Sequence, residues 1–180
     1  MKAIVFLATG FEEIEAIGII DILRRGDIET VIVSVTENID VIGAHDITVS
    51  ADELFEYMDC STADALILPG GGPGSVMLNQ HEGVRQALVD AYNNNKLIAA
   101  ICASPRVFGS LGLLKGKKAT CYPSLEPELV GATILPDAVV TDQNIITGRG
   151  PALVFDFALA ILTCLQANAG EVAGGLLFKN

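Results

Sequence analysis

One cysteine stands where the chain could make a nucleophile of it. Cys102 follows the apolar run Leu97–Ile101, which is short enough to be a strand buried on both faces. Ser104 and Pro105 then open a helical pattern, because Ser is a favourable N-cap and Pro fits the first helical turn. This strand-to-helix turn predicts an accessible thiol at the positive end of a helix, with its pKa below the free value of about 8.5.

A structural role for Cys102 is the alternative, because most free cysteines are buried and inert. Residues 100–104 have the sequence Ala-Ile-Cys-Ala-Ser. Small residues therefore permit the bend, although the glycines of the G-x-S-x-G elbow are missing. From these residues alone both interpretations stay open.

Three glutamates, Glu12, Glu13 and Glu15, begin a predicted helix that ends at Arg25. We expect Glu12 and Glu13 to be solvated and stabilised by the helix dipole. Glu15 shares a helix face with Ile19, which predicts a partly buried carboxyl with a raised pKa. A protonated Glu15 could hold a thiolate and an ionised one could shuttle protons, whereas a solvated Glu15 would do neither.

A glycine cluster, Pro-Gly-Gly-Gly-Pro-Gly at residues 69–74, follows the predicted strand Ala65–Leu68. No Lys followed by Ser or Thr comes after it, so a structural turn is favoured over a phosphate cradle. A third use is that Gly70 and Gly71 aim N–H groups at an oxyanion formed beside Cys102.

Few other side chains suggest chemistry. Arg25 ends a helix, where a solvated cation suits the dipole, whereas Arg149 precedes a helix, where its charge opposes the dipole and favours a specific partner. His45 is expected to be an exposed side chain in a hairpin over residues 41–50, and His81 to lie on the surface at a helix start. No His, Cys and carboxylate group has ligand spacing, so we expect no metal and no cofactor.

The bulk composition narrows the class of protein. A chain of 180 residues with 51% hydrophobic and 18% charged residues suits one globular domain over residues 1–180. The net charge of −11 argues against nucleic acid or an anionic membrane as partner. No apolar run approaches the roughly 20 residues of a membrane span, and the apolar N-terminal segment is interpreted as a first strand. Four scattered cysteines without disulfide spacing favour the cytoplasm.

Strand and helix patterns alternate along the chain, which predicts an α/β sandwich with helices on both faces of a mostly parallel sheet. Further predictions are a helical turn over 52–57, a helix over 81–93, a strand over 118–121, antiparallel strands over 138–141 and 145–147, and a helix over 150–166. Carboxyl ends of parallel strands meet at one edge. The first turn, the glycine cluster and Cys102 should therefore lie together.

Four segments together resemble the ThiJ/PfpI superfamily, on the branch of the Parkinsonism-linked deglycase (DJ-one) and its bacterial relatives. They are GFEEIE at 10–15, LPGG at 68–71, AAICA at 99–103, and RGP at 149–151 with FDFALA at 155–160. The resemblance covers nearly the whole chain. It implies one class I glutamine amidotransferase-like domain with a flavodoxin-like three-layer sandwich and a nucleophile-elbow cysteine.

The resemblance also implies roles for single residues. Cys102 matches the reactive, easily oxidised cysteine, and Glu15 matches the protonated glutamate that hydrogen-bonds it. Gly71 and Ala103 match the positions that offer backbone N–H groups. Relatives with peptidase activity carry His where this chain has Ala103, which argues against a protease. Relatives on the deglycase branch often carry His at the position of Tyr122, so Glu15 must handle the protons here.

The usual assembly in the superfamily is a homodimer. Arg25 matches an interface arginine, and His45 stands roughly where relatives place an Arg or His that reaches from the partner subunit. The resemblance therefore implies that the sites lie near an interface between two copies.

Two functions are compatible with these residues. The first is a glyoxalase or deglycase, of hydro-lyase or hydrolase type, linked to oxidative-stress protection, in which Cys102 attacks a small aldehyde or dicarbonyl and Glu15 moves protons. The second is a redox sensor or chaperone without turnover, in which Cys102 is oxidised and Cys121 serves as a resolving thiol.

Overall fold

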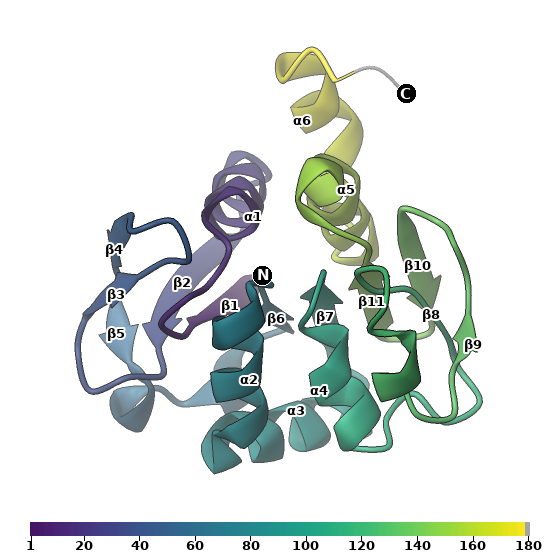
Figure 1. The fold of residues 1–180 in the computed structure, drawn as a ribbon. Helices are drawn as coiled ribbons and strands as arrows, with labels where there is room; N and C mark the ends of the chain where they lie inside the picture. The colour runs from purple at the N-terminus through teal and green to yellow at the C-terminus, as the bar shows by residue number, and fades with distance from the viewer. Residues whose placement is uncertain (179–180) are drawn as a thin grey trace.

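The computed structural model describes residues 1–178, which form a three-layer α/β sandwich (Figure 1). Its main sheet has seven strands in the order β10-β11-β7-β6-β1-β2-β5, and only the β10–β11 pair is antiparallel. The strands are β1 (Lys2–Leu7), β2 (Glu29–Ser34), β5 (Glu53–Leu54), β6 (Ala65–Leu68), β7 (Leu97–Ile101), β10 (Val139–Asp142) and β11 (Ile145–Gly148). The predicted mostly parallel, flavodoxin-like sheet is confirmed.

Helices cover both faces of this sheet (Figure 1). The helices are α1 (Glu13–Arg25), α2 (Gly72–Gln80), α3 (Glu82–Asn93), α4 (Pro105–Ser110), α5 (Val154–Cys164) and α6 (Ala169–Gly175). One core joins the sheet to α1 and α5, and the other joins it to α2, α3 and α4. Successive side chains of β1 enter opposite cores, with Val5 in the first and Phe6 in the second, which explains its unbroken apolar sequence.

Short elements lie outside the main sheet. They are the antiparallel pair β3 (Asp40–Ile42) and β4 (Thr48–Ser50), the parallel pair β8 (Lys118–Ala119) and β9 (Thr133–Ile134), and four 3₁₀ turns, η1 (Phe55–Tyr57), η2 (Cys60–Thr62), η3 (Glu126–Glu128) and η4 (Pro151–Leu153). The hairpin predicted over residues 41–50 is confirmed. The strand predicted over 118–121 is shorter and pairs with β9.

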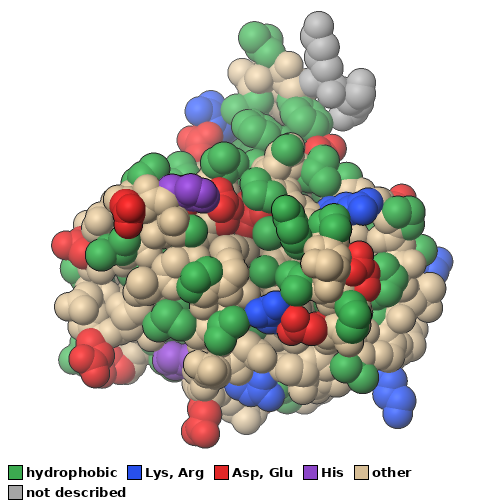
Figure 2. Space-filling model, viewed as in Figure 1, with side chains coloured by type: hydrophobic (Ala, Val, Ile, Leu, Met, Phe, Trp, Pro, Cys, Tyr) green, Lys and Arg blue, Asp and Glu red, His purple; other side chains and the backbone are tan. Residues whose placement is uncertain are grey.

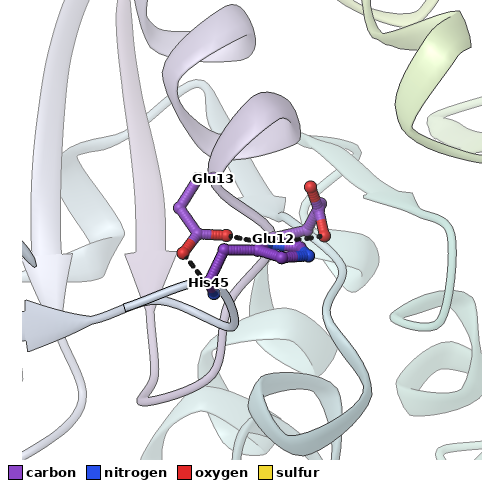
Figure 3. A group of neighbouring side chains, drawn as sticks. All are labelled: Glu12, Glu13 and His45. Carbon is purple, nitrogen blue, oxygen red and sulfur yellow. Dashed lines mark hydrogen bonds and ion pairs between the residues drawn. The ribbon is translucent and has the colours of Figure 1, made fainter. Parts of the chain in front are cut away.

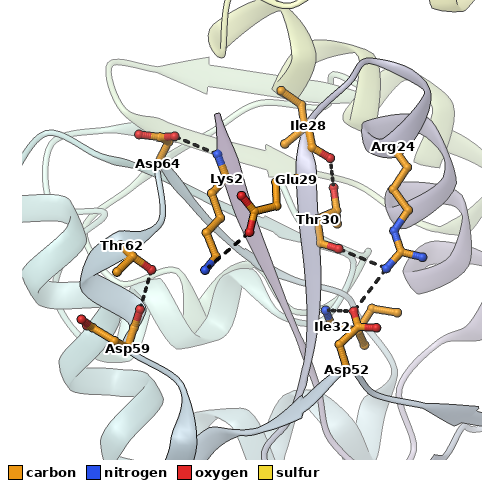
Figure 4. Close-up of polar contacts among 10 residues, drawn as sticks. All are labelled: Lys2, Arg24, Ile28, Glu29, Thr30, Ile32, Asp52, Asp59, Thr62 and Asp64. Carbon is orange, nitrogen blue, oxygen red and sulfur yellow. Dashed lines mark hydrogen bonds and ion pairs between the residues drawn. The ribbon is translucent and has the colours of Figure 1, made fainter.

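The helical turn predicted over 52–57 is wrong in its first half, because residues 53–54 form the edge strand β5. Figure 4 shows why the chain runs beside β2 there. The Asp52 carboxylate accepts hydrogen bonds from the Ile32 backbone N–H at 2.8 Å and from the Arg24 guanidinium at 3.2 Å. Arg24 also donates to the Thr30 carbonyl, so these contacts tie the end of α1 to the sheet edge.

The glycine cluster does more than turn the chain. Helix α2 starts inside it at Gly72, which the sequence patterns missed because glycine is a poor helix former. Gly71 is its N-cap with a φ of 93°, a conformation that favours glycine, and buried Ser75 and Leu78 pack the helix against the core. Tertiary packing therefore sustains this helix despite its low propensity.

No helix among residues 1–178 combines the length and the apolar character needed to cross a bilayer.

Candidate functional site

Cys102 lies at a sharp bend between the end of β7 at Ile101 and the start of α4 at Pro105. Its φ of 63° is unusual for a residue with a side chain and marks a strained backbone. The Cys102 N–H donates to the Gly148 carbonyl at 2.9 Å, and the Tyr122 N–H donates to the Cys102 carbonyl at 2.8 Å. The end of β11 and the segment that follows β8 thus hold the bend in place.

The thiol is less accessible than the sequence predicts, because Cys102 is only 8% exposed. Glu15 lies beside it and is fully buried. The Glu15 Oε2 accepts a hydrogen bond from the Gly70 N–H at 2.7 Å, whereas its Oε1 is buried without a hydrogen-bond partner among the described residues. The helical-spacing argument for a buried Glu15 is confirmed. A carboxyl with one unpaired oxygen favours its protonated form.

The acid–base properties of the two groups are coupled. Burial, followed by the charge and contact of Glu15, raises the pKa of the Cys102 thiol to about 12. Burial also raises the pKa of Glu15 to about 7, against the Gly70 N–H and the thiol contact, which lower it. The effect of Glu15 on the thiol reverses once the carboxyl holds a proton, because it then carries no charge and can donate to sulfur. A thiolate at neutral pH therefore depends on a protonated Glu15.

The prediction that the helix end alone lowers the pKa of Cys102 is wrong. The backbone N–H groups of Gly71 and Ala103 face the sulfur and lower the pKa of the thiol, but burial and Glu15 outweigh them. Helix α4 has only six residues, so its dipole is small. The Gly71 and Ala103 N–H groups nevertheless point where a negative charge on sulfur or on a bound oxygen would need them.

The prediction that the Gly70 N–H faces an oxyanion is wrong, because this N–H donates to the Glu15 carboxyl. A Cβ at Gly70 would lie 2.6 Å from the Cβ of Cys102, far inside a normal contact. Gly70 therefore lets the turn after β6 approach the cysteine and holds the carboxyl.

His45 is exposed, as expected, but is bound within its own chain. Its Nδ1 lies 2.8 Å from Glu13 Oε2 and 3.8 Å from Glu12 Oε2 (Figure 3). Among the described residues these three form a group whose potential metal-ligand atoms lie within 4.8 Å of one another. No sequence spacing revealed it, because contact between α1 and the β3–β4 hairpin assembles it.

The expectation that Glu13 is solvated is wrong, since the residue is 5% exposed. Burial raises the pKa of Glu13, but hydrogen bonds from the His45 side chain and from the backbone outweigh this and lower it overall. The helical spacing that identified Glu15 also holds for Glu13, because Ala16 and Ile20 lie three and seven residues later on a buried face. That signal would have found it.

Among the described residues, the two candidate arginines bind groups other than Cys102. Arg25 is exposed at the end of α1 and pairs with Asp21 at 2.7 Å. Arg149 donates to the Pro136 carbonyl at 2.6 Å. Burial raises the pKa of Cys121 to about 11, and the charge of Arg149 opposes this only in part. The sequence position of Arg149 predicted a specific partner, and within this chain that partner is the backbone carbonyl oxygen of Pro136.

Two further residues next to the bend matter. Ser104, taken as an N-cap from the sequence, makes no capping hydrogen bond and instead donates to the Pro69 carbonyl at 2.5 Å. It therefore joins the cysteine turn to the glycine turn. Cys121 is buried in the second core and Cys102 in the first, and the role of Cys121 as a resolving thiol stays a prediction.

Comparison with known proteins finds relatives that match most or nearly all of the chain. A family model described as the DJ-1/PfpI family matches residues 1–164. The protein dj-1beta of Drosophila melanogaster is 37% identical over 98% of this chain and 96% of its own length. A deglycase of Pyrococcus horikoshii is 32% identical over 84% of this chain and 92% of its own. The chain spans 42% of the DJ-1 homolog B of Arabidopsis thaliana, to which it is 36% identical over 99% of its own length.

Solved structures agree with these sequence relatives. The structure described as oxidized DJ-1 of Toxoplasma gondii is 35% identical, covers 99% of both chains and superposes with a TM-score of 0.95. The crystal structure of Drosophila DJ-1beta is also 35% identical, covers 99% of this chain and 98% of its own, and has a TM-score of 0.91. The buried cysteine–glutamate pair described above thus lies within a chain that belongs to the DJ-1/PfpI family.

Proposed function

We propose that this protein is a cysteine-dependent enzyme of the glyoxalase or deglycase type, acting on small reactive dicarbonyls or their adducts. One observation carries the proposal: the buried Glu15 carboxyl, with a pKa of about 7, lies against the thiol of Cys102. Such a pair holds one proton between two groups near neutral pH, which is what proton transfer at a carbon centre requires. The deglycase name of the Pyrococcus horikoshii relative supports it.

The reaction follows from this shared proton. With methylglyoxal, the Cys102 thiolate adds to the aldehyde carbon while Glu15 gives its proton to the aldehyde oxygen, forming a hemithioacetal. The Glu15 carboxylate then takes the proton from that carbon and returns it to the neighbouring carbonyl carbon, while the hydroxyl proton passes from the first oxygen to the second through the enediol, which yields a hydroxyacyl thioester. Water hydrolyses the thioester to lactate and frees the thiol. The Gly71 and Ala103 N–H groups stabilise the oxygen charge.

The test is lactate formation from methylglyoxal by the parent protein and by Cys102→Ser. The nucleophile is lost in this variant, so turnover should fall to the uncatalysed rate while the thermal midpoint stays near that of the parent. Lactate formation at the parent rate by the variant would end the proposal.

A redox sensor is the second candidate, and the N–H groups of Gly71 and Ala103 that face the sulfur favour it. Peroxide would convert the Cys102 thiol to a sulfenic acid with release of water, and further oxidation would give a sulfinate that these N–H groups can hold. The Toxoplasma relative is described as oxidized. Intact-mass analysis after mild peroxide, run beside the methylglyoxal assay, separates the two functions: oxidation at Cys102 without lactate formation would favour the sensor.

We propose a cytoplasmic homodimer as the working form. The four cysteines are free, which suits a reducing compartment. Figure 2 shows hydrophobic side chains gathered over the side of the molecule formed by α1 and α5. Ile14 and Ile17 of α1 are 60% and 45% exposed, and Phe155 of α5 is 39% exposed. Such a patch is typical of an interface. Light scattering of the parent and of Ile17→Lys would test it.

A further inference from the structure

The carboxylate of Glu13 is buried at the start of α1 and holds the loop between β3 and β4 (Figure 3). Its Oε1 accepts from the backbone N–H groups of His45 at 2.6 Å and of Ile47 at 3.5 Å, and its Oε2 contacts the His45 ring. A Cβ at Gly43 would lie 2.7 Å from the Cγ of Glu13. The loop over residues 43–47 is therefore wrapped closely around this side chain.

The loop over residues 43–47 and the end of β3 are bound to the turn after β1. The Ala44 N–H donates to the Phe11 carbonyl at 2.8 Å, and the Gly10 N–H donates to the Ile42 carbonyl at 2.7 Å. The Gly10 N–H and the Phe11 carbonyl thus both have their hydrogen-bond partners in the hairpin that Glu13 holds.

Residues 10–12, which follow β1, are hydrogen-bonded to the glycine turn that follows β6. The Glu12 N–H donates to the Gly70 carbonyl at 3.0 Å, and the Gly74 N–H donates to the Gly10 carbonyl at 3.2 Å. The two turns are packed closely together, because a Cβ at Gly71 would lie 2.7 Å from the Glu12 nitrogen. Gly70 and Gly71 then present their N–H groups to Glu15 and to the Cys102 sulfur.

We propose that Glu13 is a positioning residue: through the loop over 43–47 and residues 10–12, it fixes the Gly70 and Gly71 N–H groups against Glu15 and Cys102. The proposal rests on the proposed function for its turnover readout, but its chemical readout does not. A displaced Gly70 N–H would weaken its hydrogen bond to Glu15, and that bond opposes the effect of burial on the pKa of Glu15.

The groups that face Glu15 set the expected direction. They are the Cys102 thiol, the Gly70 N–H and, one turn earlier on the same segment, the charge of Glu12, which raises the pKa of Glu15. Loosening the glycine turn removes the Gly70 donor from Glu15 and also moves the Gly71 N–H, which lowers the pKa of the thiol, away from the Cys102 sulfur. Loss of this donor to sulfur should move the pH midpoint of Cys102 reactivity upward.

The experiment compares Glu13→Ala, Glu13→Gln and a control on the same hairpin, Asp40→Ala, which removes only the acceptor of the Ser50 hydroxyl. Glu13→Ala should lower kcat for methylglyoxal about tenfold with KM within about twofold, because one poorly aligned donor costs at least that much. Its pH midpoint for Cys102 alkylation should rise by about half a unit. Glu13→Gln keeps an acceptor for both backbone N–H groups and should recover most of the loss, and Asp40→Ala should behave like the parent.

Parental kcat and a parental alkylation midpoint in Glu13→Ala would overturn the proposal. If Glu13→Ala fails to fold, Gly43→Ala displaces the carboxyl from the loop side and should show the same two changes; parental values in both readouts would equally overturn the proposal. Should the parent form no lactate, the proposed function fails, while the alkylation midpoint still decides the role of Glu13.

Discussion

Glu13 and Glu15 are two residues apart on α1, both almost fully buried, and their pKa values move in opposite directions. Glu13 accepts two backbone N–H groups and contacts an imidazole, so its charged form is favoured. Glu15 accepts one N–H and has an unpaired oxygen, so burial dominates and its neutral form is favoured up to about pH 7. Glu15 also lies deeper below the protein surface than Glu13, so the number of donors and the depth of burial together separate the pKa values of the two carboxyls.

The largest expected effect is on turnover, and it tests whether Glu15, and not Glu13, transfers protons. Glu15→Gln keeps the shape of the carboxyl but can neither hold nor move its proton, so turnover of methylglyoxal should fall about 10²–10⁴-fold. Steady-state kinetics measure this, with Glu13→Gln as the matched substitution two residues away. An equal loss in both variants would mean that the two carboxyls are not distinguished by function.

The second prediction concerns the space between the two turns. Gly70→Ala places a Cβ 2.6 Å from the Cys102 Cβ and against the Glu15 carboxyl, so one of the turns must move. We expect a loss of about 1–3 kcal/mol in the free energy of unfolding, measured by urea denaturation. Gly72→Ala is the control, because nothing lies within 4 Å of its Cβ position. A Gly70→Ala variant as stable as this control would show that the contact is not limiting.

The third prediction sharpens the comparison through the pH dependence of stability. The pKa of Glu15 is raised to about 7 in the folded protein, so between its ordinary value near 4.5 and pH 7 the folded state binds more protons. The parent should therefore lose stability as pH rises through this window and level off above it. Glu15→Gln lacks this titration, so its stability relative to the parent should increase by about 3 kcal/mol between pH 4.5 and pH 8. A stability difference between Glu15→Gln and the parent that stays constant from pH 4.5 to pH 8, measured by denaturant unfolding, would contradict this prediction.

The sequence was sufficient for the sheet and for the pair at its edge. The apolar strands and the face shared by Glu15 and Ile19 are local patterns, and both predictions are confirmed. The thiol's pKa was predicted in the wrong direction because burial and the charge of Glu15 come from tertiary contacts that no local pattern contains. Helix α2 was missed because packing overrides the low propensity of its glycines.

The Glu12, Glu13 and His45 group shows the same limit in another form. His45 is 32 residues from Glu13, and a hairpin of two three-residue strands brings them together. The helical spacing predicts that Glu13 faces inward, but it cannot tell which loop meets it there. The sequence therefore predicts which side of α1 faces inward, but it does not predict which loop packs against that side.

The smallest expected effect tests whether the His45 contact contributes to stability at all. The hydrogen bond to Glu13, and then the charges of Glu12 and Glu13, raise the pKa of His45 above its ordinary value of 6.5. Its contribution to stability should be complete below pH 6.5 and be lost as pH rises through the folded-state pKa. His45→Gln should remove this slope, as followed by denaturant midpoints between pH 6 and pH 9. Because the imidazole is exposed, solvent screens the pair, and the backbone N–H groups of the loop carry most of its attachment to Glu13. An unchanged slope in His45→Gln would assign the attachment of the loop to those N–H groups alone.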